Sequence, residues 1–167
     1  RRTSAASSAR DDSLADLSDD DSDAGASLFA MIKESGVSMA SVVQDWKQRY
    51  VEDAEGALTE LINFMIESSG CQPNQLTQEE VMDDDEDNDR RMEIVKRLAE
   101  AMPKDQQNYP LVTKGRQWNA FKDNLRAFWP AVIRVANPDV LYDELMFSTL
   151  VDWVISLSSL EIRAFRH

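Results

Sequence analysis

The feature that most limits how this chain folds is the spacing of its apolar residues. Between positions 39 and 66 they recur every three or four residues, the period of helices with one buried face. The first stripe comprises Met39, Val42, Val43, Trp46 and Tyr50, and the second comprises Ala57, Leu58, Leu61, Ile62, Met65 and Ile66. Because only Glu52 and Asp53 separate the two predicted helices, we expect them to be antiparallel neighbours.

The same spacing predicts helices over most of the remaining chain. We expect a short helix from Leu28 to near Gly36 and further helices at 90–102, 116–136, 138–157 and from Leu160 onward. The aromatic residues on these stripes should be mostly buried. They are Trp46, Phe64, Trp118, Phe121 and Trp153.

Prolines mark three further local expectations. Pro110 favours an extended segment over Tyr109–Val112, because it disfavours helix at the residue before it. Pro130 should kink the helix that contains it. Asn137 and Pro138 have the residue types of a helix N-cap and first helical position, so we expect a new helix to begin there. Asp143 and Glu144 are adjacent on this helix and should face different ways, as a solvated or capping pair.

These elements predict an all-α fold in which antiparallel helix pairs form the N-terminal part of a HEAT-like α-solenoid. The helix predicted at 138–157 is apolar on two sides and therefore needs a further layer of structure. No short motif recurs at a fixed period, which argues against tetratricopeptide and ankyrin repeats. We expect the chain to be a fragment of a longer one.

Charge divides the chain into domains and linkers. Residues 1–26 are rich in Ser, Ala and Asp and should form a disordered acidic tail. Residues 79–89 hold eight acidic residues and no basic one, so 72–89 is expected to be a flexible acidic loop, with one turn near Glu79–Met82. The helical domain is expected at 28–167. Residues 90–167 hold 12 Lys and Arg against nine Asp and Glu, although the whole chain has a net charge of −13.

The sequence lacks the residues that several classes of function require. The longest apolar run, Ala127–Ile133, has seven residues, too few to cross a bilayer. Cys71 is the only cysteine and His167 the only histidine, and no phosphate-binding or nucleophile motif is present. The run Asp83–Asp87 has no glycine, unlike a calcium loop. We therefore expect no enzyme activity, metal, cofactor, small-molecule substrate or membrane contact.

The basic residues of the second half form the main candidate site. Cations without base-specific partners suit contacts with phosphate backbones, although ordinary solvated helix faces look the same. The candidate DNA or partner surface comprises Lys114, Arg116, Lys122, Arg126, Arg134, Arg163 and Arg166.

Hydroxyl residues in the N-terminal tail are candidate phosphorylation sites. Basic residues precede Thr3 and Ser4, and acidic residues surround Ser18 and Ser22, patterns that suit kinases. A solvated tail with chance matches is the alternative.

Several segments in order resemble the stromal-antigen (stromalin) family, the HEAT-repeat accessory subunits of cohesin. The resemblance covers about residues 28–167 and matches the N-terminal conserved domain of that family. It is carried by Trp46, Tyr50, Leu61–Phe64, Ser68–Cys71, Tyr109–Leu111, Gln117, Trp118, Phe121, Leu141–Glu144 and Ile162–His167.

The resemblance implies a non-enzymatic cohesin subunit in the nucleus, on chromosomes. Such a subunit would bind kleisin, other cohesin subunits and regulators, and DNA or chromatin, and would act in sister-chromatid cohesion and chromosome segregation. Two other classes stay open: an unrelated HEAT-type adaptor that binds protein partners without DNA, and the regulatory domain of an enzyme.

Overall fold

The computed structural model describes residues 26–34, 36–71, 75–83, 89–102, 109–141 and 143–166, and every regular element in these ranges is helical. The α-helices are α1 (Leu28–Lys33), α2 (Met39–Glu52), α3 (Ala54–Ser68), α4 (Gln78–Val81), α5 (Asp89–Ala101), α6 (Arg116–Leu141) and α7 (Glu144–Ser158). A short 3-10 helix, η1 (Arg163–Arg166), follows. The predicted all-α fold of HEAT-like helix pairs is confirmed.

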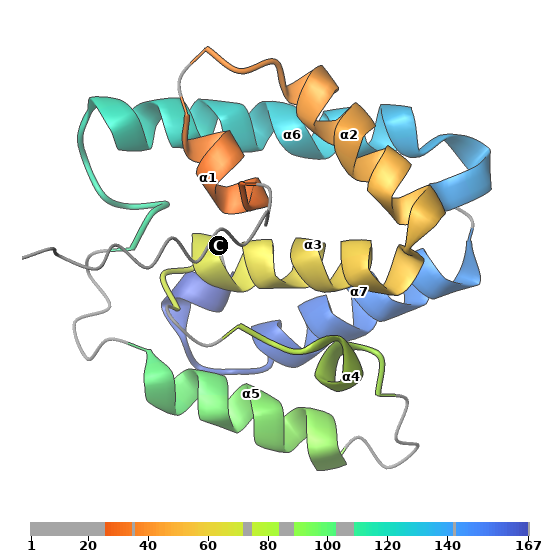
Figure 1. Cartoon of the computed structure of the whole chain (residues 1–167). Helices are drawn as coiled ribbons and strands as arrows, with labels where there is room; N and C mark the ends of the chain where they lie inside the picture. The colour runs from red at the N-terminus through yellow and green to blue at the C-terminus, as the bar shows by residue number, and fades with distance from the viewer. Residues whose placement is uncertain are drawn as a thin grey trace, which may run out of the picture.

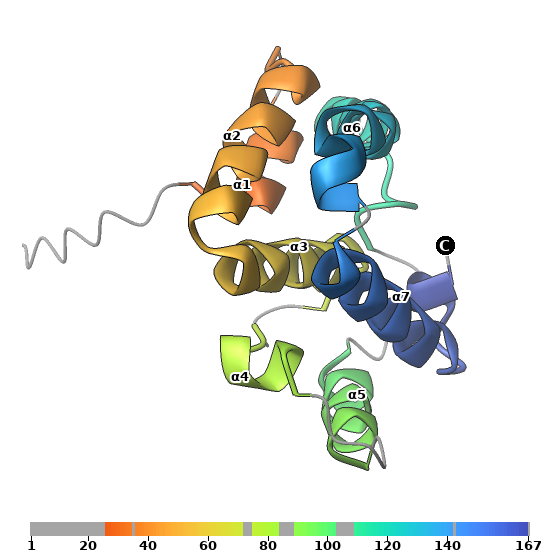
Figure 2. The same ribbon diagram turned by 90° about the vertical axis from the view of Figure 1, so that its right-hand side faces the viewer.

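Helix α3 occupies the centre of the molecule. It contacts α1 and α2 on one side and α4 and α7 on the other. The long helix α6 lies against α1 and α2, while α5 packs on α7 at the opposite end (Figures 1 and 2). None of the helices in the described part of the chain is long and apolar enough to cross a lipid bilayer.

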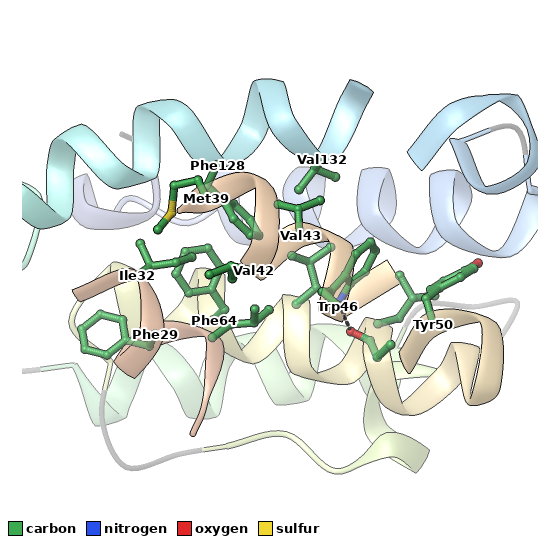
Figure 3. Packing of buried hydrophobic residues seen from close by; sticks show 14 of the residues in the cluster. Phe29, Ile32, Met39, Val42, Val43, Trp46, Tyr50, Phe64, Phe128 and Val132 are labelled. Atoms are coloured by element: carbon green, nitrogen blue, oxygen red, sulfur yellow. Dashed lines mark hydrogen bonds between the residues drawn. The ribbon is translucent and has the colours of Figure 1, made fainter. Parts of the chain in front are cut away.

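The antiparallel pair α2–α3 forms as predicted because one residue serves both helix ends. The N–H of Asp53 donates to the carbonyl of Arg49 at 2.7 Å and closes α2. The Asp53 carboxylate then accepts from the N–H of Gly56 at 3.0 Å and caps α3. Trp46 on α2 fastens the pair, since its indole N–H donates to the carbonyl of Ala57 at 3.0 Å (Figure 3).

Two groups of buried side chains hold the helices together. The first joins α1, α2, α3 and α6, and its fully buried members include Trp46, Phe64, Phe121 and Phe128. Phe64 and Phe128 meet edge to face with ring centroids 5.3 Å apart (Figure 3). The second joins α3, α4, α5 and α7 around Trp153. The predicted burial of these aromatic residues is confirmed, and Trp118 lies at the edge of the first group, partly exposed.

The helix break predicted at Asn137 and Pro138 is wrong. Helix α6 continues through Pro130 and past both residues to Leu141, and α7 begins only at Glu144. Asp143 is the true N-cap, because its carboxylate accepts from the N–H of Leu145 at 3.0 Å. The capping role expected for the Asp143–Glu144 pair is therefore confirmed for Asp143, although Asp143 precedes α7 and is not within it. The kink expected at Pro130 stays a prediction.

Two other local expectations also need correction. Tyr109–Val112 is a turn and not an extended segment, since the Tyr109 carbonyl accepts from Val112 at 3.0 Å and from Thr113 at 2.9 Å. Pro110 suits this turn because its fixed φ favours the second position. The last helix does not begin at Leu160: residues 160–162 are irregular, and the 3-10 helix η1 begins at Arg163.

The predicted acidic loop is partly ordered. The expected turn near Glu79–Met82 is helix α4, which opens with a reciprocal capping box between Thr77 and Glu80. Leu76, just before α4, and Val81, its last residue, are buried in the second core group. Within 72–89, residues 72–74 and 84–88 lie outside the described residues, as do 1–25 of the predicted tail with its candidate phosphorylation sites.

Candidate functional site

The predicted basic residues of α6 follow the length of the helix and do not form one cluster. Arg116 is its first residue, and Arg126 and Arg134 are exposed farther along it. At 1.5 Å per residue, Arg116 and Arg134 lie about 27 Å apart along the axis. Lys114 is exposed just before the helix begins. A row of this length matches an extended partner better than a small ligand.

Two of these residues are already engaged within the chain. Lys122 is half-buried, and its ammonium donates to the Thr113 carbonyl at 3.0 Å, which ties α6 to the preceding turn. Arg126 pairs with Asp123 one turn earlier at 3.0 Å, with both side chains about three-quarters exposed. An exposed pair of this kind is weak and can exchange for a phosphate. Arg116 and Arg134 have no partner among the described residues.

Arg163 and Arg166 lie on a different element. Both are exposed on η1, which packs against α7, and the Nε–H of Arg166 donates to the Leu160 carbonyl at 2.9 Å. The structure therefore separates the predicted surface into a row on α6 and a pair on η1.

Most basic side chains of α5 form ion pairs with acidic residues of α4, of the residues just after α4, or of α7. Arg90 bonds Glu79 at 3.1 Å and Asp83 at 3.0 Å, and Arg97 bonds Glu80 at 2.7 Å. The hydrogen bond from Arg97 lowers the pKa of Glu80, with the Thr77 cap contributing in the same direction. Arg91 reaches Asp152 on α7 at 3.6 Å. This pairing leaves α6 as the more available basic helix.

Several residues that carry the family resemblance join separate helices or segments by side-chain hydrogen bonds. We call these connections latches. The hydroxyl of Tyr50 on α2 donates to the Asp143 carboxylate at 2.8 Å, which joins the end of α2 to the start of α7. Burial raises the pKa of Tyr50 well above its usual value, and the hydrogen bond and charge of Asp143 raise it further. The phenol therefore stays protonated and remains a donor.

Asn63 holds the segment before α4 in the same way. Its amide group donates to the Leu76 carbonyl at 2.9 Å and accepts from the Leu76 N–H at 2.7 Å. Trp153 secures the other end, since its indole N–H donates to the Val81 carbonyl at 3.1 Å. Neither role was predicted from the sequence. A polar Asn63 within the apolar run Leu61–Phe64 was the one available indication.

Asn124 also connects two helices, a role that was not predicted from the sequence. Its side-chain amide on α6 donates to the carbonyls of Ile32 at 2.9 Å and Glu34 at 3.0 Å, and so satisfies acceptors at the end of α1. Nothing in its local sequence distinguishes Asn124 from an ordinary surface residue.

The described residues contain no group of three or more His, Cys, Asp or Glu side chains arranged to hold a metal ion. Cys71 is buried, and burial raises the pKa of its thiol, so the unreactive protonated form is favoured.

Comparison with known proteins decides the family. A STAG domain model matches residues 107–167, which include α6, α7 and η1. The chain belongs to the stromalin family. It is 34% identical over 140 residues to cohesin subunit SA-1 of Xenopus laevis, 32% over 142 residues to cohesin subunit SA-3 of Mus musculus, and 29% over 143 residues to cohesin subunit SA-3 of Homo sapiens.

Each of these stromalin matches covers 84% of this chain but only 11% of the relative. The chain thus spans about a ninth of the length of the curated relatives. Membership of the stromalin family removes the alternative of an unrelated HEAT-type adaptor. The relatives are named as subunits of cohesin.

Proposed function

We propose that this chain is the helical N-terminal region of a non-enzymatic cohesin subunit. In the full-length protein it would act in sister-chromatid cohesion and chromosome segregation, on chromosomes in the nucleus. The observation that carries the proposal is the 34% identity to cohesin subunit SA-1 across 84% of the chain. In this role the protein binds kleisin, other cohesin subunits and their regulators, and it contacts DNA.

In this proposal the region has two roles: it holds its helices in fixed positions, and it presents positive charge to DNA. The latches from Tyr50, Asn63 and Asn124 fix the helices relative to one another, so that α6 presents its cations along a rigid line. Arg116, Arg126 and Arg134 would contact phosphates in succession. Such contacts add affinity and orientation without selecting a base sequence.

The DNA part of the proposal is tested in the full-length protein with a matched pair of variants. Replacing Arg126 and Arg134 by Ala removes two cations from α6, and replacing Lys47 and Lys96 by Ala removes two from α2 and α5. The first variant should bind DNA more weakly for every sequence, with a salt slope flatter by up to about 0.9 per lost contact. The second variant should change the DNA affinity and the salt slope much less. Equal effects of the two variants would remove α6 from the DNA surface.

The cohesin part is tested separately by co-purification of kleisin with the full-length protein. Both variants should retain kleisin, because none of the four side chains they remove forms one of the hydrogen bonds between helices described above. Loss of kleisin from the unmodified full-length protein would contradict the cohesin assignment itself.

Thr3, Ser4, Ser18 and Ser22 remain proposed phosphorylation sites in the acidic tail. Each phosphate would add negative charge, and repulsion between that charge and DNA should weaken binding most at low salt. Phosphate mapping by mass spectrometry on protein purified from dividing cells tests the assignment.

A further inference from the structure

A cavity of about 170 Å³, open to solvent, is formed by residues of α3, α6, α7 and η1. Its walls include Phe64 of α3, Trp129 of α6, Leu157 of α7 and Phe165 of η1, which lies beside α7 (Figure 2). None of the described side chains that line it is ionisable. The cavity therefore disfavours a charged ligand, because a charge there would lose hydration without gaining a partner.

One buried hydroxyl among the lining residues lacks a partner. Ser68, the last residue of α3, is only 6% exposed, and its hydroxyl has no hydrogen-bond partner among the described residues. Two other serines bond to their own helices: Ser69 donates to the carbonyl three residues earlier at 2.6 Å, and Ser156 to the carbonyl four residues earlier at 2.7 Å. Because buried polar groups are nearly always hydrogen-bonded, the Ser68 hydroxyl indicates a site for a polar atom of a ligand.

The walls of the cavity are held in place by contacts with the core. The Trp129 ring lies against Phe128 and Phe64, with ring centroids 5.4 and 6.4 Å apart. Phe64 in turn meets Phe128 edge to face (Figure 3). Leu157 is buried in the second core group. Since these partners fix the walls, the cavity is preformed, as most ligand sites are.

The size of the cavity matches a single ring. An apolar cavity of roughly 150 Å³ is large enough to hold benzene, whereas sites for drug-sized molecules occupy about 300–1,000 Å³. Phe64, Trp129 and Phe165 supply aromatic rings against which a ligand ring can pack. The matching ligand is thus an uncharged aromatic ring with one group that bonds Ser68. A phenol has such a group, because its hydroxyl both donates and accepts, as the serine hydroxyl does.

We propose that this cavity binds an uncharged phenol, with the ring packed against Trp129 and Phe165 and the hydroxyl bonded to Ser68. The phenol can belong to a free small molecule or to a tyrosine side chain of another protein, and the ring and its hydroxyl are common to both. Arg126 and Arg134 are not among the lining residues, so an occupied cavity leaves these cations of α6 uncovered. The proposal is therefore independent of DNA binding and of kleisin binding.

The test is a titration of the full-length protein with p-cresol, the side-chain analogue of tyrosine, followed by ligand-observed NMR. A ligand of one ring should saturate the site with a dissociation constant of about 1 mM. Ser68→Ala should weaken the binding of p-cresol about fivefold and leave the binding of toluene, which lacks the hydroxyl, nearly unchanged. Equal effects on the two ligands, or no saturable binding of p-cresol up to about 10 mM, would overturn the proposal.

A pair of tryptophan variants tests the place of binding. Val154 lines the cavity and is 43% exposed, whereas the neighbouring Ile155 is 60% exposed and is not among the lining residues. Val154→Trp should fill the cavity and abolish the binding of p-cresol, and Ile155→Trp should leave it unchanged. Both variants should keep the far-UV circular dichroism of the wild type, because both sites are at the surface. Retained binding in Val154→Trp, or equal losses in the two variants, would contradict the assigned site.

N-acetyl-L-tyrosinamide distinguishes the two sources of the phenol. If the ligand is a tyrosine of another protein, this blocked amino acid should bind at least as tightly as p-cresol, because its backbone can remain outside the open cavity. Binding of p-cresol without binding of the blocked tyrosine would assign the site to a free phenol. Failure of both ligands to bind would refute a phenol site.

Discussion

Removing the Tyr50 hydroxyl should weaken the connection between α2 and α7. In Tyr50→Phe the ring still fills its buried site, and only the 2.8 Å hydrogen bond to Asp143 is lost. A hydrogen bond to a charged group contributes about 1.5–3 kcal/mol. Because Asp143 is half-exposed and water can replace the phenol, we expect a loss near the lower limit, about 1.5 kcal/mol in the free energy of unfolding.

A double-mutant cycle isolates this interaction from the helix cap. Asp143→Ala should cost about 2–3 kcal/mol, because it removes the bond to Tyr50 and also the cap on the Leu145 N–H, which alone contributes about 1 kcal/mol. Asp143→Asn retains a good cap and should cost less. In the Tyr50→Phe, Asp143→Ala double variant the losses should fall short of additivity by about 1 kcal/mol.

The assay is urea unfolding of the 167-residue chain, followed by tryptophan fluorescence and far-UV circular dichroism. Val51→Ala is the matched control, because Val51 neighbours Tyr50 on α2 but is 73% exposed, and it should change stability by less than about 0.5 kcal/mol. A coupling energy below about 0.3 kcal/mol would refute the reasoning, since Tyr50 and Asp143 would then act independently.

Two further predictions concern α4 and the tryptophans. The pKa of Glu80 is lowered in the folded chain, so its contribution is present above the unfolded value of about 4.3 and is lost as pH falls through the folded value. The urea midpoints of wild type and Glu80→Gln should therefore differ at pH 6, and the difference should shrink as the pH falls below the unfolded value; a constant difference would contradict this. Trp153→Ala should cost about 3–5 kcal/mol, whereas Trp118→Ala, at a partly exposed site, should cost about 2 kcal/mol. Equal losses in urea unfolding would show that burial does not set the difference.

Local sequence was sufficient wherever neighbours along the chain decide the structure. The helices at Met39–Glu52, Ala54–Ser68 and Asp89–Ala101 lie within a few residues of their predicted positions. Apolar period and capping residues act over one or two turns, so a helix and its buried face can be read without knowing its partners. Family membership could also be predicted, because the residues that carry it keep their order along the chain.

The tertiary structure decided the features that depend on distant residues. Asn137 and Pro138 have the local character of a helix start, yet the break lies at Asp143, which Tyr50 holds from 93 positions away. Leu76 and Val81 are in an acidic segment that predicts a loop, but Asn63 and Trp153 bond to their backbones and bury them.

The candidate site also combines features that the sequence predicts with features that only the tertiary structure decides. The sequence identifies which residues are basic, but Lys122 is bonded to Thr113, whereas the Arg134 cation has no partner among the described residues. It also predicts that the last long helix is apolar on two sides, without saying which side the domain itself covers. Packing buries Trp153 and leaves Phe147 and Ile155 exposed. A residue's type determines what it can contact, and only the folded chain determines which contacts are within reach, because the groups concerned are brought together by helices far apart in sequence.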